Sequence, residues 1–196
     1  MSGLRILSGD AKGRVLKTLK SDDLSIRPML GRMKKSLFDI IRPRLHDSEF
    51  LDLFAGTGAV GLEALSNGAR RVVFVEQSPV SLKLIKDNID MLGWSARCNM
   101  QRADVTKGFS WLKVQFDIIF MGPPYKDANK LPLALTSPAL RAVAEAGLIL
   151  DDGLIICQHH KKESVTAPYG IELFRQEKYG DTLVSFFRRQ EKAINV

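Results

Sequence analysis

The chain has 196 residues, 45% of them hydrophobic and 26% charged, a balance typical of one globular domain with a full core. It has no apolar run near the roughly 20 residues of a membrane helix and no signal-peptide pattern at its start, so we expect a cytoplasmic protein without membrane attachment. The two cysteines and three histidines show no spacing that would place them on one metal ion, so no metal is expected.

The net charge of +7 lies entirely in the first 45 residues. They hold 11 Lys or Arg residues and 4 acids, whereas residues 46–196 hold 18 of each. Within this segment, residues 4–19 have the pattern of a short β-rich arm, with Gly9 and Gly13 as turn residues. A basic arm on a neutral body indicates a polyanionic partner, although charge alone leaves a solvated basic face open as the alternative.

After the arm, the pattern of apolar residues predicts a helix and then a regular alternation. The helix is expected at about residues 32–42, where Pro43 ends it. Near-continuous apolar strands then alternate with helices, which predicts a mostly parallel sheet covered on both faces, the doubly wound α/β class. A last pair of strands within residues 170–189 turns too tightly to be parallel and must add an antiparallel hairpin. The expected strands are 50–54, 71–76, 96–101, 116–121 and 153–158, and the expected helices are 58–67, 78–92, 106–112 and 132–146.

The first strand leads into a glycine-rich turn that opens a helix. Gly56, Gly58 and Gly61 form G-x-G-x-x-G, and Glu76 ends the next strand, 20 residues after Gly56. Such glycines let a nucleotide-like ligand approach the backbone, and an acid at that strand end accepts hydrogen bonds from ribose hydroxyls. NAD and S-adenosylmethionine both fit this pattern. Candidate cofactor-binding residues are Asp52, Phe54, Ala55, Gly56, Thr57, Gly58, Glu76 and Asp104.

Two acids favour S-adenosylmethionine over NAD. Asp52 precedes the loop, where an anion would repel the pyrophosphate of NAD but attract a sulfonium and an ammonium group. Asp104 lies at the expected end of the third strand, where it could accept from the adenine amino group. A small NAD-dependent oxidoreductase remains a weak alternative, because the sequence has no Tyr-x-x-x-Lys or other hydride-transfer pattern.

The strand at 116–121 runs into Gly122-Pro123-Pro124-Tyr125. With the glycine loop and the acidic strand end, this turn resembles that of the amino-methyltransferases of DNA and RNA. The sequence most resembles the bacterial 16S ribosomal RNA (guanine-N2)-methyltransferases, and the resemblance covers nearly the whole chain. It includes the arm with Lys12-Gly13-Arg14, and Lys178-Tyr179-Gly180-Asp181 before the last strand.

The resemblance implies a Rossmann-like methyltransferase fold with a seven-stranded sheet and S-adenosylmethionine as cofactor. It implies an RNA-binding arm and helix in residues 1–45, a methyltransferase domain in 46–196, and a monomer that acts on ribosomal RNA or the small ribosomal subunit. Its catalytic turn would be Gly122, Pro123, Pro124 and Tyr125, with Tyr125 stacked on an extruded base. The candidate RNA contacts are Lys12, Arg14, Lys17, Arg27 and Arg32.

The turn departs from the family pattern at its first residue. The family has Asp or Asn before Pro-Pro, whose side chain accepts a hydrogen bond from the target amine, whereas Gly122 has no side-chain acceptor. Three interpretations stay open: a nearby group such as Asp127 or a water substitutes, activity is reduced, or the chain is a non-catalytic RNA-binding relative that acts in ribosome assembly. Loss of one such contact typically costs about 10²–10³ in rate, which predicts slow catalysis that Gly122→Asp accelerates.

Overall fold

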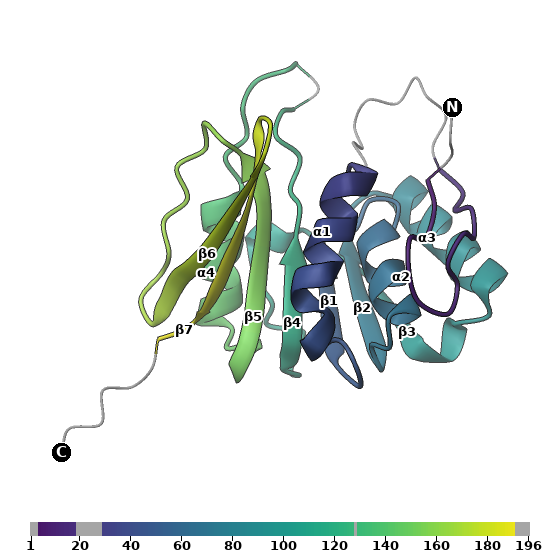
Figure 1. The fold of residues 1–196 in the computed structure, drawn as a ribbon. Coiled ribbons are helices and arrows are strands. Elements are labelled where there is room, and N and C mark those ends of the chain that lie inside the picture. Colours follow the sequence, from purple (N-terminus) through teal and green to yellow (C-terminus); the bar gives the residue numbers. More distant parts are fainter. Residues whose placement is uncertain (1–3, 19–28, 128, 191–196) are drawn as a thin grey trace.

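The computed structural model describes residues 4–18, 29–127 and 129–190 (Figure 1). Its strands form one seven-stranded sheet in the order β3-β2-β1-β4-β5-β7-β6. The strands are β1 (Glu49–Leu53), β2 (Arg71–Glu76), β3 (Cys98–Arg102), β4 (Phe116–Met121), β5 (Ile149–His160), β6 (Ile171–Tyr179) and β7 (Thr182–Arg189). The helices are α1 (Gly31–Ile41), α2 (Ala59–Ser66), α3 (Pro79–Leu92) and α4 (Thr136–Glu145). The predicted doubly wound α/β class is confirmed.

Parallel pairing joins the first five strands of the sheet, and antiparallel pairing adds the last two. β1 pairs with both β2 and β4, and β4 pairs with β5, all in parallel register. β7 lies antiparallel between β5 and β6. The turn between β6 and β7 contains Gly180 at φ 64°, a left-handed backbone that glycine adopts without steric cost. The antiparallel C-terminal hairpin is therefore also as predicted.

Helices cover both faces of the sheet, which gives two hydrophobic clusters. Along β1, Phe50 packs into the cluster that includes residues of α1, α2 and α3, whereas Leu51 and Leu53 pack into the cluster with α4. This alternation follows from the two-residue period of a strand, and both kinds of position are apolar because neither face meets water. Figure 1 shows α1 lying across the face of the sheet near β1 and β4.

The N-terminal arm packs on the body of the domain. Ile6 and Leu16 are buried in the same cluster as α1, α2 and α3. Only an isolated bridge between Arg5 and Val15 is present in the described part of the arm, so the expected β-rich arm is mostly turn and extended chain. Backbone amides that a long hairpin would pair are bound instead by side chains of α2, Glu63 among them.

A buried ion pair fastens the arm. The Nζ atom of Lys34 lies 2.7 Å from Oε2 of Glu63, and both side chains are about 1% exposed. Glu63 also accepts hydrogen bonds from the backbone amides of Leu7 and Ser8, and Lys34 donates to the carbonyl of Arg5 at 2.8 Å. Every charge in the pair is thus matched by further polar contacts, as a buried ion pair requires. One of the basic residues of the N-terminal segment is therefore unavailable to any ligand.

Two predicted helices differ in the structure. The helix expected at 106–112 is wrong, because only the 3-10 turn Val105–Lys107 forms before Gly108 adopts φ 82°. The helix expected from residue 132 begins at Thr136, because Pro132 pairs with Lys126 in an isolated bridge and Ala134 adopts φ 44°. No helix in the described ranges has the length and apolar character needed to cross a membrane.

Candidate active site at the carboxyl ends of the strands

The glycine loop turns sharply where β1 ends. Phe54, Gly56 and Gly58 all have positive φ, at 57°, 54° and 75°. For Phe54 such a conformation costs of order 1–3 kcal/mol and persists only where surrounding contacts enforce it. The amide of Ala55 donates to Val75 of β2 at 3.2 Å, and the amide of Gly58 donates back to Ala55 at 2.7 Å. Backbone hydrogen bonds thus hold this strained loop in one shape, as pre-organised ligand sites require.

Glu76 lies at the end of β2 and faces this loop. Its Oε2 accepts from the amide of Gly56 at 2.9 Å, and its Oε1 accepts from the amide of Ser78 at 2.9 Å. The half-buried carboxylate therefore ties the loop to the start of α3. Each carboxylate oxygen has more than one lone-pair direction, so both can still accept ribose hydroxyls. The residue predicted to bind ribose thus lies beside the loop and also supports it.

Asp52 has a different environment from the one we expected. Its side chain is 1% exposed and accepts from the amide of Gly61, in α2, at 2.9 Å. Burial raises its pKa to about 8, the Gly61 amide opposes this rise, and the nearby Glu76 adds to it. A pKa this high favours the neutral carboxyl at pH 7 in the free protein, whereas the sequence predicted an anion at Asp52. A role for Asp52 in cofactor binding therefore stays a prediction without that charge.

Asp104 follows β3, on the far side of β2 from the glycine loop. Its Oδ1 accepts from the amide of Thr106 at 3.0 Å and from the hydroxyl of Thr106 at 2.7 Å. The Thr106 hydroxyl, followed by the amide, lowers the pKa of Asp104. The strand order β3-β2-β1 places Asp104, Glu76 and the glycine loop at three successive strand ends. This spacing fits an extended ligand with an adenine, a ribose and a charged tail.

The remaining glycines of the motif serve packing and the turn. A Cβ on Gly61 would lie 2.4 Å from the ring of Phe74, so only glycine lets α2 pack this closely on β2. A Cβ on Gly58 would lie 3.2 Å from Ile85 in α3, and its positive φ disfavours any side chain. The neighbouring loop residue Thr57 is buried, at 4% exposed. These residues therefore fit a cofactor that meets backbone in a narrow space.

The Gly122–Tyr125 turn leaves β4 beside this loop, and the amide of Gly122 reaches the carbonyl of Leu53 at 3.4 Å. The Tyr125 hydroxyl donates to Oγ1 of Thr182 at 3.3 Å and accepts from Nε2 of Gln158 at 3.0 Å. The ring of Tyr125 meets that of His160 edge-on, with centroids 5.8 Å apart. The predicted aromatic is thus anchored to β5 and β7, through contacts that the sequence did not predict.

Asp127 does not reach the turn as a free acceptor. Its Oδ1 accepts from the amide of Leu131 at 2.8 Å, which closes the loop that follows Tyr125. The same loop is held by hydrogen bonds between the backbones of Asp127 and Leu131 and of Asp127 and Lys130. Asp127 is therefore better explained as a loop-stabilising residue than as a substitute for the missing side chain at Gly122.

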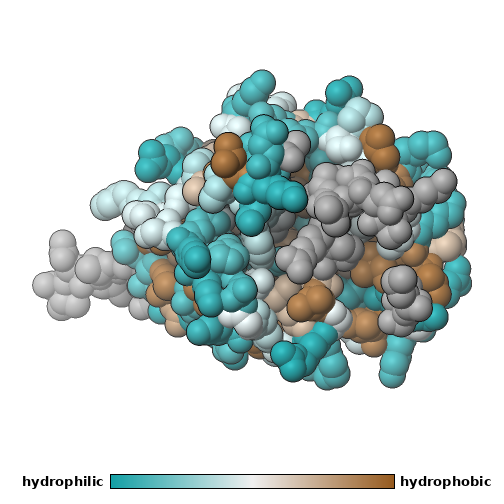
Figure 2. All heavy atoms as spheres, turned by 90° about the horizontal axis from the view of Figure 1, so that it is seen from above, coloured by the Kyte–Doolittle hydropathy of each residue, from teal (hydrophilic) through white to brown (hydrophobic). Residues whose placement is uncertain are grey.

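The predicted RNA contacts lie on two parts of the surface. Lys12, Arg14 and Lys17 are exposed on the arm, where Arg14 also donates to the carbonyl of Met91 and Lys17 lies 3.5 Å from Asp87. Arg32 is exposed on α1, and Arg27 lies outside the described residues. Figure 2 views the molecule from above relative to Figure 1 and shows mainly hydrophilic side chains on the side of β5, β6 and β7, away from the arm.

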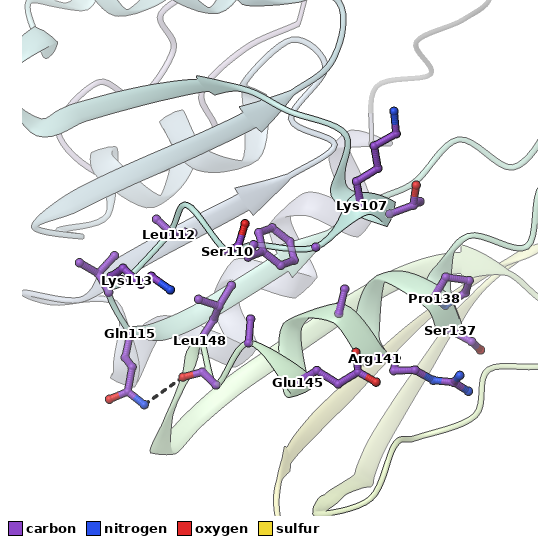
Figure 3. A pocket seen from close by; sticks show the side chains of 17 residues that line it. Lys107, Ser110, Leu112, Lys113, Gln115, Ser137, Pro138, Arg141, Glu145 and Leu148 are labelled. Atoms are coloured by element: carbon purple, nitrogen blue, oxygen red, sulfur yellow. Dashed lines mark hydrogen bonds between the residues drawn. The ribbon is translucent and has the colours of Figure 1, made fainter.

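A separate cavity of about 920 Å³ lies between residues 106–115 and α4 (Figure 3). Its rim carries Lys107, Lys113, Arg141 and Glu145, and its floor is partly apolar. The hollow forms where the predicted helix at 106–112 is replaced by an irregular loop. None of the residues predicted for the cofactor or the target base lines it, so it is distinct from the site described above.

Comparisons with known proteins identify the family. The family described as Conserved hypothetical protein 95 (Cons_hypoth95) matches residues 4–188. The chain is 31% identical to Ribosomal RNA small subunit methyltransferase D of Haemophilus influenzae over 184 residues, 90% of this chain and 89% of that protein. It is 27% identical to the protein of the same name from Escherichia coli, over 95% of this chain and 90% of that protein.

A solved structure shares the fold. The Escherichia coli protein titled "Putative methyltransferase yhhF" superposes with a TM-score of 0.81 at 24% identity, over 96% of this chain and 99% of that one. At that identity the likeness shows the fold alone, a mostly parallel Rossmann-like sheet. The family match over nearly the whole length goes further: this chain belongs to the Cons_hypoth95 family, and it is a methyltransferase.

Proposed function

We propose that this protein transfers a methyl group from S-adenosylmethionine to the exocyclic N2 amine of a guanine in 16S ribosomal RNA. The observation that carries the proposal is the meeting of two sites at one edge of the sheet. The strained loop with Glu76 suits an adenosine cofactor, and the Gly122–Tyr125 turn, which suits a flipped base, follows the adjacent strand. The relatives named as small-subunit rRNA methyltransferases supply the substrate class.

The residues that would hold S-adenosylmethionine lie along three strand ends. Glu76 would bind the ribose hydroxyls, Asp104 the adenine amino group, and the loop from Phe54 to Gly58 the methionine portion. When bound, the cofactor supplies an electrophilic methyl group on a positively charged sulfur. The neutral carboxyl of Asp52 would support the loop through Gly61 rather than attract this charge.

The protein must activate the target amine, whereas the methyl donor is already reactive. The lone pair of an exocyclic guanine amine is delocalised into the ring, so hydrogen-bond acceptors on its protons must localise it for attack. Tyr125 would stack on the extruded base, which holds the amine in line with the methyl carbon. Because the donor is already reactive, correct placement of the amine accounts for much of the catalysis.

The basic arm would bind the RNA backbone. Lys12, Arg14, Lys17 and Arg32 are exposed, and together with Arg27 they would contact phosphates without reading sequence. We propose that residues 1–45 serve this purpose as part of one monomeric chain. The described part of this segment packs in the same hydrophobic cluster as α2 and α3, which supports a binding surface continuous with the rest of the protein.

Transfer of a tritiated methyl group tests this proposal. The protein and labelled S-adenosylmethionine are incubated with small ribosomal subunits, and separately with 16S rRNA, from cells that lack the modification. Nuclease digestion to nucleosides should then place the label in N2-methylguanosine. Label in another nucleoside would contradict the guanine-N2 assignment. Cofactor binding and RNA binding without any label would instead favour the non-catalytic relative that Gly122 suggests.

A further inference from the structure

Gly122 has no side chain, and the side chain of Gln158 lies near the space that one would occupy. A Cβ built on Gly122 would lie 3.2 Å from the ring of Phe120 and 3.8 Å from Oε1 of Gln158. Gln158 belongs to β5, and it follows directly after the register pair Met121 and Cys157 of the parallel strands β4 and β5. Gln158 and Gly122 are therefore neighbours across the sheet, although 36 positions separate them in the sequence.

The hydrogen bonds of Tyr125 match an orientation of the Gln158 amide in which its oxygen faces the turn. The Tyr125 hydroxyl donates to Oγ1 of Thr182 and accepts from the Gln158 amide. The amide nitrogen of Gln158 makes that bond at 3.0 Å, which turns its oxygen away from Tyr125 and toward Gly122. No donor among the described residues bonds this oxygen, and the side chain of Gln158 is half-buried.

We propose that the amide oxygen of Gln158 is the acceptor for the target amine, in place of the side chain that Gly122 lacks. This inference rests on the proposed amine methyltransferase function. The acceptor for the target amine would then come from β5 instead of β4, and it reaches the same space from the neighbouring strand. The chemistry is matched, because a carboxamide oxygen is the acceptor that an Asn at position 122 would present.

The reaction balances with an acceptor of this kind. The amine nitrogen forms a bond to the methyl carbon as the carbon–sulfur bond breaks, and the bonding pair stays on sulfur, which becomes uncharged. The nitrogen gains the positive charge and releases one of its protons to water. The Gln158 oxygen accepts a hydrogen bond throughout and takes no proton, because an amide oxygen is too weak a base.

Two other polar side chains that follow the turn or lie against Tyr125 each hold a neighbouring backbone amide. Asp127 is bound to the amide of Leu131, and Nδ1 of His160 accepts from the amide of Lys162 at 3.2 Å. Gln158 differs from these groups because it hydrogen-bonds the Tyr125 hydroxyl, so one side chain positions both the stacking ring and the acceptor. This arrangement replaces our expectation that Gly122→Asp alone accelerates the reaction, because a second acceptor would compete with the first.

Two variants test the proposal: the first removes the acceptor, and the second returns an acceptor at position 122. Gln158→Ala should lower the single-turnover rate of methyl transfer to small-subunit RNA by about 10²–10³-fold, with cofactor affinity unchanged. Adding Gly122→Asn to that variant should recover at least tenfold of the loss, since Gly122 does not have a left-handed backbone and Phe120 needs to move only by a few tenths of an ångström. Gln176→Ala removes a matched glutamine on β6 and should leave the rate unchanged.

Tyr125→Phe distinguishes a role of Gln158 as hydrogen-bond acceptor from a role as support for Tyr125. It removes the hydroxyl that orients Gln158 but keeps the oxygen and the ring, so its rate should fall less than that of Gln158→Ala. An unchanged rate in Gln158→Ala overturns the inference. So does a slow Gln158→Ala that Gly122→Asn does not improve, because the glutamine would then act only as a support. If the unmodified protein methylates no RNA in the same assay, the proposed function itself fails, and the inference fails with it.

Discussion

The cofactor side and the target side of the site are built in different ways. The cofactor loop is held by short-range contacts: Glu76 binds the amides of Gly56 and Ser78, and the loop bonds to itself and to the adjacent strand. The target side depends on side chains from three strands or their ends, because Tyr125 follows β4, Gln158 lies in β5 and Thr182 begins β7.

This difference determines which changes each side tolerates. On the cofactor side, most hydrogen bonds that hold the loop are donated by backbone amides. Few side-chain substitutions can therefore replace a hydrogen-bond partner that is lost there. On the target side, a side chain from one strand can occupy the space left by another, as Gln158 does beside Gly122. We therefore expect departures from a family motif to be compensated more readily on the target side.

The largest effect should come from Glu76→Ala on the cofactor side. Two hydrogen bonds from ribose hydroxyls to a charged acceptor contribute roughly 1.5–3 kcal/mol each, so binding of S-adenosylmethionine should weaken by about two to four powers of ten. Isothermal calorimetry measures the change. The matched control is Glu172→Ala, a partly exposed glutamate on β6 paired with Arg188, which should leave the affinity unchanged. Equal affinities in the parent and Glu76→Ala would disprove the cofactor assignment.

A comparable effect on the same side is the pH dependence of stability due to Asp52. Its pKa is about 8 in the folded protein and near 3.8 when unfolded, so between these values the folded state holds a proton that the unfolded state has released. The contribution of Asp52 to stability should then fall as pH rises from about 4 to 8, by up to about 1.4 kcal/mol for each pH unit. Asp52→Asn removes this contribution, so the parent should lose unfolding free energy relative to the variant across that window.

Urea unfolding at a series of pH values measures this difference. Asp104→Asn is the control, because the lowered pKa of Asp104 gives the opposite sign: its contribution is present above pH 3.8 and is lost as pH falls. Parallel curves for the parent and Asp52→Asn would show that Asp52 is ionised in the folded protein. A buried anion would then lie beside the cofactor loop, where it would attract the sulfonium.

The next effect concerns the ion pair that joins the arm to the cofactor side. Lys34→Met leaves the buried Glu63 without its cation, and removal of one partner from such a pair costs about 3–5 kcal/mol of unfolding free energy. The control is Lys35→Met, on the same helix, whose pair with Asp39 is exposed and should contribute little. Urea unfolding compares the two. A similar stability in both variants would mean that Glu63 does not need Lys34.

The sequence predicted the cofactor side better than the target side, for a physical reason. Period-two and helical patterns, the glycines and Glu76 all act within about 25 consecutive residues, where local geometry decides the outcome. The role of Gln158 depends on the register between β4 and β5, which shifts between Phe116 and Ile118, and a residue count cannot supply that shift. The ion pair between Lys34 and Glu63 was missed for the same cause, because its partners meet only when α1 packs on α2.

Burial was the second limit on prediction. Asp52 and Glu76 both lie near the ends of neighbouring strands and look equivalent in the sequence, but only Glu76 remains partly exposed, and it binds an amide of the cofactor loop. The loop at 108–115 shows a third limit, because a pattern of apolar residues suits a helix while Gly108, at φ 82°, ends it after a single turn.

The smallest effect is expected on RNA binding by the arm. Neutralising Lys12, Arg14 and Lys17 should weaken binding to all RNA sequences alike, because these side chains are exposed and would contact phosphates and not bases. The slope of log affinity against log salt should become shallower by about 2–3, at roughly 0.7–0.9 for each phosphate that is no longer neutralised. Filter binding at a series of salt concentrations measures both quantities.

The control neutralises Lys107, Lys113 and Arg141, which removes the same charge from the rim of the cavity beside α4. A smaller change in the control would place the RNA backbone along the arm. Equal changes in the two variants would mean that only net charge matters, and the arm would then be a solvated basic face that Lys34 and Glu63 hold in place for stability alone.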